Sequence, residues 1–316
     1  MNMLKVSRSG KVQLCFLVVA AAIGSASASQ NEATFDFNYG FNSSAISTDM
    51  VDYTDSAGTA LRGYFAYDNA TVAERPAVVV IPDYDGIGPY ELWRANLLAQ
   101  LGYAAFVADI YGVEQTQGPA LNMSEAGRLS GMYNMNPDLL LDRVTAGIAE
   151  VQTQPMVQPN ATVVIGYCFG GTAVLDLAAS WPAMTDGVLG VMAFHAGSGP
   201  SAMIDMNEGN PIRISVQQGF DDPSISPDEA LATQRMWEDM GVKWEWTWYS
   251  QTVHAFTQPQ LVGPAASAMA AYSAIADERS WLALRTFLLD LFGYITPQNQ
   301  YANTTMSDSM GTMSFA

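Results

Sequence analysis

A pentapeptide near the middle of the chain combines the residue types that covalent catalysis needs. Gly166-Tyr-Cys168-Phe-Gly170 has the form Gly-x-nucleophile-x-Gly, with cysteine at its centre. This form is typical of a nucleophile elbow, a tight strand-to-helix turn that exposes one reactive side chain. Glycines are needed there because larger side chains would clash where strand and helix pack around a strained residue. A glycine-rich turn with a buried, inert cysteine has the same pattern, so the pentapeptide alone leaves both interpretations open.

The residues on either side of the pentapeptide fit the elbow geometry. Val163 to Ile165 is a β-branched run suited to a buried parallel strand. After the cysteine, Ala173 and Leu177 stand four residues apart, which is the spacing of one helix face. A helix that begins at Cys168 would direct the positive end of its dipole at the sulfur. That arrangement favours a thiolate and a developing oxyanion.

A cysteine nucleophile needs a base, and the base needs an orienting group. The chain has two histidines; His195 ends one predicted strand and His254 follows another. Two adjacent acids, Asp221 and Asp222, follow another. The order of nucleophile, acid and His254 is that of α/β-hydrolases, and active sites of parallel sheets lie at the carboxyl ends of strands. We expect His195 to anchor a loop or to contact the catalytic residues from outside the site, rather than to act as the base.

Segments of strand and helix character alternate along most of the chain. This alternation predicts an α/β fold, with a mostly parallel central sheet flanked by helices on both faces. A single domain of residues 52–293 is expected, preceded by a lead-in at 29–51 and followed by a polar tail at 294–316. The predicted strands are residues 61–67, 76–81, 103–110, 163–165, 187–195, 212–218 and 243–249. The predicted helices are residues 91–101, 119–135, 137–154 and 227–240, with one or two more in 265–292.

The first 28 residues have the pattern of a secretory signal peptide. Basic residues at positions 5, 8 and 11 precede an apolar stretch, and Ala26-Ser-Ala28 is an A-x-A cleavage site. A short membrane anchor is the alternative, but the apolar stretch falls short of the about 20 residues that span a bilayer. We therefore predict a bacterial protein exported to the periplasm or secreted, with no stable membrane insertion after cleavage near Ser29.

The chain is strongly acidic, with 13 Lys and Arg residues, 31 Asp and Glu residues and a formal net charge of −18. Cleavage after residue 28 would remove three basic and no acidic residues, which leaves a net charge of −21. Such a surface disfavours nucleic acids and anionic membranes as partners. Cleavage would also leave Cys168 as the sole cysteine, which excludes an intramolecular disulfide. The sequence contains no metal-ligand cluster or phosphate loop, so we expect no cofactor.

Several of these segments together resemble the dienelactone hydrolase family, cysteine hydrolases of the α/β-hydrolase fold. The resemblance covers nearly all of residues 52–293, and its Gly-x-Cys-x-Gly-Gly and His-x-Phe motifs are quite specific in combination. The segments that carry it are residues 61–67, 101–106, 109–112, 166–171, 193–197, 219–223 and 253–256.

The resemblance implies a role for three side chains. Cys168 would be the nucleophile, His254 the base and Asp222 the acid that orients the base. Asp222 is chosen over Asp221 because the family's acid stands directly before the residue that corresponds to Pro223. Asp221 would then be a solvated neighbour or a residue that caps the loop.

The resemblance also implies the groups around the thiol. A family glutamate that interacts with the resting thiol corresponds to Asp83, whose side chain is one methylene shorter. The backbone N–H groups of Tyr84 and Phe169 would form the oxyanion hole. Two arginines that bind the substrate carboxylate in the namesake enzymes are replaced here by Val113 and Gln258.

The sequence therefore predicts a hydrolase that cleaves a small ester or lactone through a Cys-His-Asp triad and an acyl-enzyme intermediate. The missing arginines favour uncharged substrates over anionic ones. A non-catalytic binding protein on the same fold is one alternative, because fold does not fix function. A thiol redox protein is another, although the mature chain would lack a resolving cysteine. The sequence leaves the oligomeric state open.

Overall fold

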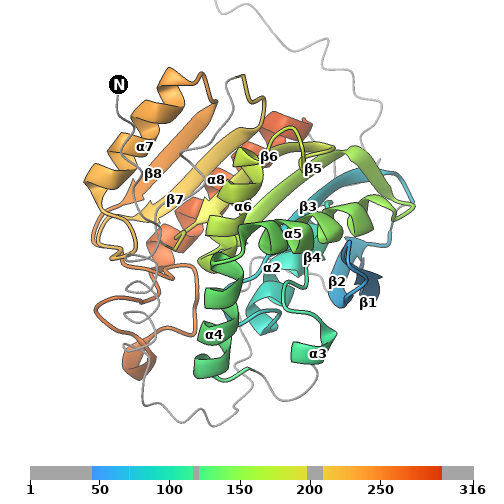
Figure 1. Cartoon of the computed structure of the whole chain (residues 1–316), viewed down its shortest axis with the longest axis horizontal. Coiled ribbons are helices and arrows are strands. Elements are labelled where there is room, and N and C mark those ends of the chain that lie inside the picture. Colours follow the sequence, from blue (N-terminus) through green and yellow to red (C-terminus); the bar gives the residue numbers. More distant parts are fainter. Residues whose placement is uncertain (1–44, 71, 117–120, 198–208, 294–316) are drawn as a thin grey trace, which may run out of the picture.

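The computed structural model describes residues 45–70, 72–116, 121–197 and 209–293, built around one sheet (Figure 1). Its eight strands lie in the order β1-β2-β4-β3-β5-β6-β7-β8. β2 runs antiparallel to both of its neighbours, β1 and β4, and every other neighbouring pair is parallel. The expected mostly parallel α/β sheet is therefore confirmed. The strands are β1 (Ile46–Thr54), β2 (Ala60–Asp68), β3 (Arg75–Ile81), β4 (Ala104–Val107), β5 (Val157–Tyr167), β6 (Val188–Phe194), β7 (Arg213–Gly219) and β8 (Trp244–Tyr249).

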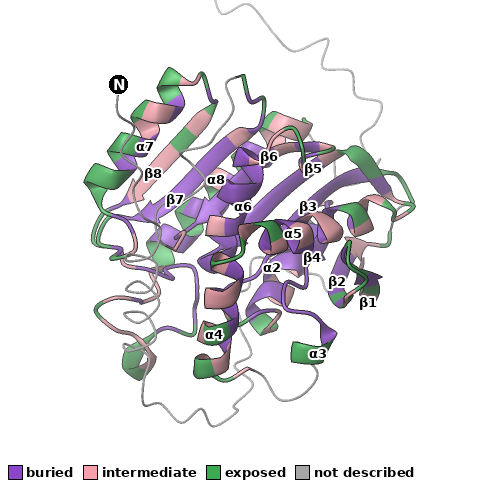
Figure 2. Ribbon diagram, in the orientation of Figure 1, coloured by how far each residue is buried: buried purple, intermediate pink, exposed green. Residues whose placement is uncertain are grey.

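The central strands are apolar on both faces because helices cover both sides of the sheet. Figure 2 shows these strands buried along most of their length, and all seven residues of β3 are buried. Along β3, Val78 and Val80 face one hydrophobic cluster while Val79 and Ile81 face the other. This alternation follows from the two-residue period of a strand, and the continuous apolar run is typical of parallel strands.

Each face of the sheet has its own set of helices. Leucine and aromatic side chains of the first set pack on the face of Val78, and those of the second set on the face of Val79. The first set is α2 (Pro89–Gln100) and α8 (Ala274–Phe292). The second set is α4 (Met123–Asn134), α5 (Pro137–Gln152), α6 (Phe169–Ala179) and α7 (Pro227–Asp239).

Two elements differ from the sequence-based expectation. β1 (Ile46–Thr54) pairs along its whole length with β2, so the sheet begins within the expected lead-in of residues 29–51. A short helix, α3 (Val113–Thr116), follows β4 and was not expected. The expectation of one or two helices in residues 265–292 is confirmed, since the single long helix α8 lies there after a short 3₁₀ turn, η3 (Gly263–Ala265).

The predicted signal peptide and polar tail lie outside the described residues. Within the described ranges, no helix is long and apolar enough to cross a membrane.

Candidate active site

Four side chains that the sequence singles out follow the carboxyl ends of parallel strands. Asp83 follows β3, Cys168 follows β5, Asp222 follows β7 and His254 follows β8. The carboxyl ends of parallel strands lie at one edge of a sheet, where active sites of open α/β folds form. All four residues are buried. The structure thus brings together residues that are up to 171 positions apart in the chain.

The backbone at Cys168 has the strained geometry of an elbow. Its φ of 51° and ψ of −109° lie outside the conformations that non-glycine residues ordinarily adopt, and α6 begins at the next residue. A Cβ at Gly166 would lie 2.0 Å from the carbonyl oxygen of Gly170, and one at Gly170 would lie 2.2 Å from that of Ile81. The two glycines are therefore required because backbone passes within contact distance of both.

The cysteine, histidine and second aspartate form a continuous chain of contacts. Nε2 of His254 lies 3.0 Å from Sγ of Cys168, and Nδ1 of His254 lies 2.8 Å from Oδ2 of Asp222. With Nδ1 donating to the carboxylate, the lone pair of Nε2 faces the sulfur. This arrangement can move a proton from the thiol to the imidazole.

The structure distinguishes the two neighbouring aspartates. Asp221 is exposed, whereas Asp222 is buried and contacts the histidine. Gln218 donates from Nε2 to Oδ2 of Asp222 at 2.6 Å, and the backbone N–H of Ser224 donates to Oδ1 at 2.8 Å. These donors fix the orientation of the carboxylate that faces His254.

Ser224 is a member of the site that the sequence analysis missed. Its hydroxyl donates to Oδ1 of Asp222, and its Oγ lies 3.0 Å from Nδ1 of His254. The only sequence signal was its place two residues after the acid in a turn, where serine side chains commonly bond to nearby groups.

Asp83 also hydrogen-bonds to the Cys168 thiol. Its Oδ1 accepts the backbone N–H of Tyr84 at 2.5 Å, and its Oδ2 accepts a hydrogen bond from Nε2 of Gln258. The expected partner of the resting thiol is therefore in contact with it. The thiol has one proton, and both Asp83 and His254 are within reach of it.

Burial and negative charge raise the pKa of the Cys168 thiol well above its usual value. Burial has the largest effect, followed by the charge and hydrogen bond of Asp83 and the charge of Asp222, while the N–H of Phe169 opposes them. Burial likewise raises the pKa of Asp83, against the opposing effects of the Tyr84 N–H, His254, Cys168 and Gln258. The resting sulfur is therefore a neutral thiol.

Two opposing effects act on the pKa of His254. Burial lowers it, because imidazolium loses solvation, but the charge and hydrogen bond of Asp222 raise it, with a further contribution from Asp83. The net result is a raised pKa. His254 is consequently a stronger base than an isolated imidazole.

Each of the two backbone N–H groups expected in an oxyanion hole contacts a group of the site. The N–H of Phe169 interacts with the sulfur, and the N–H of Tyr84 donates to Asp83. Tyr111 supports both residues, since its hydroxyl donates to the carbonyl of Tyr84 at 2.6 Å and its ring centroid lies 6.0 Å from that of Phe169. A substrate oxygen at the Tyr84 N–H would have to replace the Asp83 carboxylate.

His195 packs against the ring of His254. It is fully buried, its ring meets that of His254 edge to face at 5.2 Å, and its Nε2 lies 2.7 Å from Oγ1 of Thr257. Burial lowers its pKa well below the usual value, with smaller contributions from His254 and Arg94. A neutral ring at this position supports His254 without adding charge.

A buried ion pair anchors the segment that carries Thr257. Arg94 of α2 pairs with Asp277 of α8, and both side chains are 2% exposed. Nη2 of Arg94 also donates to the carbonyl of Thr257 at 2.9 Å. These contacts hold the guanidinium of Arg94 in the protein interior, so it is not available to bind a substrate.

Comparison with known proteins gives the family. The model of the dienelactone hydrolase family matches residues 61–292, which is most of the chain and contains all of the side chains described above. The chain belongs to the dienelactone hydrolase family. This membership, with the mostly parallel sheet, gives the α/β-hydrolase fold and makes the chain a dienelactone hydrolase-like hydrolase of esters or lactones.

Proteins similar to this chain include a solved structure and curated sequences. A dienelactone hydrolase-like promiscuous phosphotriesterase from metagenomic libraries is 30% identical with a TM-score of 0.70, over 79% of this chain and 100% of that one. A putative carboxymethylenebutenolidase of Synechocystis sp. is 34% identical over 39% of this chain and 50% of the relative. A probable 2-oxo-3-(5-oxofuran-2-ylidene)propanoate lactonase of Bradyrhizobium sp. is 30% identical over 44% of this chain and 55% of the relative. The chain thus spans about half the length of these two curated relatives.

Proposed function

We propose that the protein hydrolyses uncharged carboxylic esters or lactones with Cys168 as nucleophile, His254 as base and Asp222 as the orienting acid. The observation that carries the proposal is the continuous contact from Sγ through the imidazole to the carboxylate, at 3.0 and 2.8 Å. Nucleophile and base within hydrogen-bond reach, with the base held by a third group, are what covalent acyl transfer requires.

The first step is activation of the thiol. At rest the sulfur is protonated, because burial and the Asp83 charge raise its pKa. His254 takes the thiol proton at Nε2 as the sulfur attacks the substrate carbonyl. The resulting imidazolium is stabilised by Asp222, to which Nδ1 donates. Sγ of Cys168 and Nε2 of His254 are already in contact, so the sulfur can lose its proton as it attacks the carbonyl.

The second requirement is stabilisation of the negative charge on the carbonyl oxygen. The backbone N–H groups of Phe169 and Tyr84 are the donors we assign to this role. The N–H of Tyr84 becomes available when the substrate oxygen takes the place of Asp83 Oδ1. Each oxyanion donor contributes about 2.7–4 kcal/mol to the transition state.

Collapse of the tetrahedral intermediate breaks the bond from the carbonyl carbon to the alcohol oxygen. The imidazolium of His254 gives its proton to that oxygen, and the acyl group remains on the sulfur as a thioester. Water then attacks the thioester, with His254 again accepting a proton, and the carboxylic acid product and free thiol are formed.

The residues at the two positions where the namesake enzymes carry arginines support an uncharged substrate. Gln258 is neutral and donates to Asp83, while Val113 is buried and apolar. Neither can form the two charge-assisted hydrogen bonds by which an arginine binds a carboxylate. The net charge of −18 adds long-range repulsion of anions.

The test is turnover of p-nitrophenyl acetate by the purified protein and by Cys168→Ala and His254→Ala. We expect each substitution to abolish nearly all activity, and iodoacetamide to inactivate the wild type with one equivalent bound at Cys168. Circular dichroism of the variants controls for loss of fold. Turnover by Cys168→Ala at the wild-type kcat would show that another residue performs the reaction.

A further inference from the structure

Thr257 ties the loop that carries His254 to two other parts of the fold. Its Oγ1 lies 2.7 Å from Nε2 of His195, which follows β6, and 2.6 Å from the hydroxyl of Tyr90 in α2. Its carbonyl accepts a hydrogen bond from Nη2 of Arg94 at 2.9 Å. Both the side chain and the backbone of Thr257 are thus bonded to residues outside the loop.

A consistent order of hydrogen-bond donors in this network begins at Arg94. Arginine can only donate, and Nε of Arg94 donates to the hydroxyl of Tyr90 at 3.2 Å. The Tyr90 proton can then go to Oγ1 of Thr257, and the Thr257 proton to Nε2 of His195. In this order the hydroxyl of Thr257 accepts one hydrogen bond and donates another. Its removal would take a partner from both Tyr90 and His195.

His195 connects Thr257 to the proposed base. The ring of His195 meets that of His254 edge to face, with centroids 5.2 Å apart, and meets that of Phe256 in the same way at 5.2 Å. All three residues are buried. Because protein interiors are close-packed, the ring of His254 cannot shift toward His195 without displacing it. A hydrogen bond that fixes the His195 ring therefore fixes the surface against which His254 packs.

The backbone on both sides of this ring contact is strained. Ala255, which directly follows His254, has a φ of 55°, and His195 has a φ of 36°. Residues other than glycine seldom adopt a positive φ, and such conformations persist where surrounding contacts hold them. The hydrogen bonds of Thr257 are contacts of this kind. Without them, the loop and the His195 ring can relax, and the position of the His254 imidazole changes with them.

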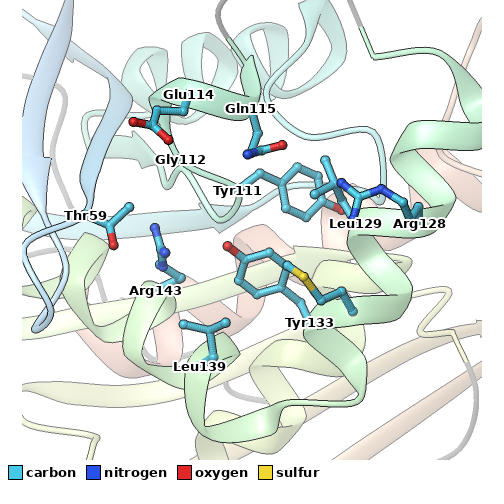
Figure 3. Close-up of a pocket in the computed structure, with 11 residues that line it drawn as sticks. Thr59, Tyr111, Gly112, Glu114, Gln115, Arg128, Leu129, Tyr133, Leu139 and Arg143 are labelled. Atoms are coloured by element: carbon cyan, nitrogen blue, oxygen red, sulfur yellow. The ribbon is translucent and has the colours of Figure 1, made fainter.

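The network is separate from a cavity of about 290 Å³ that Tyr111 and Arg143 line (Figure 3). Thr257, His195 and Tyr90 are not among the described residues that line this cavity. Water held there is therefore not placed to replace a hydroxyl removed from Thr257. Since buried polar groups without partners are costly, the former partners of that hydroxyl would move toward other groups.

We propose that Thr257 is a positioning residue for the proposed base, and that its hydroxyl, through His195, holds the His254 ring with Nε2 directed at the Cys168 sulfur. The distance from Nε2 to Sγ is 3.0 Å. A proton moves between these two atoms during attack, so a small displacement of the ring slows the chemical step. The inference rests on the proposed function, since positioning affects hydrolysis only if His254 is the base.

The kinetic test compares two substitutions of Thr257 in the hydrolysis of p-nitrophenyl acetate. Thr257→Val keeps the shape of the side chain and removes the hydroxyl. We expect kcat to fall about 10- to 100-fold, because a displacement of about 1 Å can cost about 100-fold in rate. Thr257→Ser keeps the hydroxyl and should retain most of the wild-type kcat.

The pH dependence of hydrolysis gives a second reading of the position of His254. Asp222 raises the pKa of His254, so a ring displaced from Asp222 should have a lower pKa and remain neutral to lower pH. The acid limb of kcat/KM should therefore move to lower pH in Thr257→Val, and stay in place in Thr257→Ser. A purely structural role of the threonine would lower the amount of folded protein without moving this limb.

Two further variants serve as control and as test of the route through His195. Thr233 is also a buried threonine, and its hydroxyl donates to the carbonyl of Glu229 within α7, so Thr233→Val should keep the wild-type kcat. If Thr257 acts through His195, the loss of kcat in Thr257→Val/His195→Phe should not exceed the larger of the two single losses. Circular dichroism of each variant controls for loss of fold.

A proton NMR signal that needs no turnover separates this inference from the proposed function. Nδ1 of His254 lies 2.8 Å from Oδ2 of Asp222, and its proton should resonate far downfield. The signal is identified by its absence in His254→Ala. We expect it to shift in Thr257→Val and to stay in place in Thr257→Ser. Full turnover by Cys168→Ala would end the proposed function, whereas this signal would still report the position of the ring.

Three results would overturn the inference. The first is a wild-type kcat in Thr257→Val with an unmoved downfield signal. The second is an equal loss of kcat in Thr257→Val and Thr257→Ser, which would assign the effect to packing rather than to the hydroxyl. The third is an equal loss in Thr257→Val and Thr233→Val, which would show a general effect of buried threonine substitution. Each of these can occur while Cys168→Ala is inactive, so the triad could stand without this role of Thr257.

Discussion

Gln258 donates a hydrogen bond from Nε2 to Oδ2 of Asp83, the carboxylate that also bonds to the Cys168 thiol. A neutral residue at position 258 holds this carboxylate without neutralising it. The negative charge of Asp83 therefore acts on the sulfur and, together with burial, raises the pKa of the thiol. The same contact shows that a side chain at position 258 reaches the carboxylate that contacts the sulfur.

Replacement of Asp83 should make the thiol more acidic. Asp83→Asn removes a charge that raises the pKa of Cys168, so the pH profile of alkylation by iodoacetamide should move to lower pH. At pH 7 the variant should react faster than the wild type. Asp221→Asn, at an exposed position, is the matched control and should leave the profile unchanged. An unshifted or raised profile in Asp83→Asn would refute the proposed effect of Asp83 on the sulfur.

An arginine at position 258 should change the preferred substrate charge. The wild type should hydrolyse the methyl ester of dienelactone with higher kcat/KM than dienelactone itself, which carries a free carboxylate. Gln258→Arg should raise the relative kcat/KM for the free acid by about tenfold, since a charge-assisted hydrogen bond is worth about 1.5–3 kcal/mol.

Gln234→Arg adds the same charge on α7 and controls for a general electrostatic effect. Two outcomes count against this assignment: a wild type that prefers the free acid by tenfold, or equal gains in both arginine variants.

The choice of acid can be tested by the pH dependence of hydrolysis. His254 must be neutral to accept the thiol proton, and Asp222 raises its pKa, so activity should be lost as pH falls through a value above 6.5. Asp222→Asn should move this acid limb of kcat/KM to lower pH and reduce kcat by about 10²–10⁴-fold. Asp221→Asn should neither shift the acid limb nor reduce kcat. If Asp221→Asn has both effects and Asp222→Asn has none, Asp221 is the orienting acid.

Much of the site could be predicted because its chemistry limits the residue types. Only glycine fits at positions 166 and 170, because a Cβ there would lie about 2 Å from a backbone oxygen. The elbow can therefore be recognised in the sequence from its Gly-x-Cys-x-Gly pattern. Strand ends place Cys168, Asp222 and His254 at one edge of the sheet, and their order in the chain identified the set. The selection between the two aspartates required the family resemblance.

The supporting residues could not be predicted in the same way. Ser224, Gln218 and Thr257 are ordinary polar residues, and nothing in their spacing marks them. Ser224 contacts His254 from 30 positions away and Thr257 contacts His195 from 62 positions away, while Gln218 contacts Asp222 within the same segment. The cavity beside Arg143 could not be predicted from the sequence either. It forms only where the turn between β1 and β2 packs with α3, α4 and α5.

β1 was missed because it is an edge strand. Met50 is exposed while Tyr53 is buried, and polar residues occupy much of the rest of Ile46–Thr54. Edge strands have a single partner and keep polar groups in solvent, so their sequences resemble loops. Pairing with β2, a long-range contact, is what makes this segment a strand.

Export with cleavage remains a prediction from the basic, apolar and A-x-A segments of residues 1–28. Mass spectrometry of the protein from its native host should find a mature N-terminus near Ser29. Ala28→Asp should block processing, because the cleavage site requires small residues. An abundant form that retains Met1 would be inconsistent with this prediction.

The covalent intermediate is the central claim, and rapid mixing with p-nitrophenyl acetate tests it most directly. The proposed mechanism predicts a burst of one p-nitrophenolate per protein molecule whenever deacylation is the slower step, and an acetyl group on the Cys168 peptide after acid quenching. Cys168→Ala should show neither signal. Steady hydrolysis by the wild type with the acetyl group on another residue, or undiminished hydrolysis by Cys168→Ala, would contradict the account.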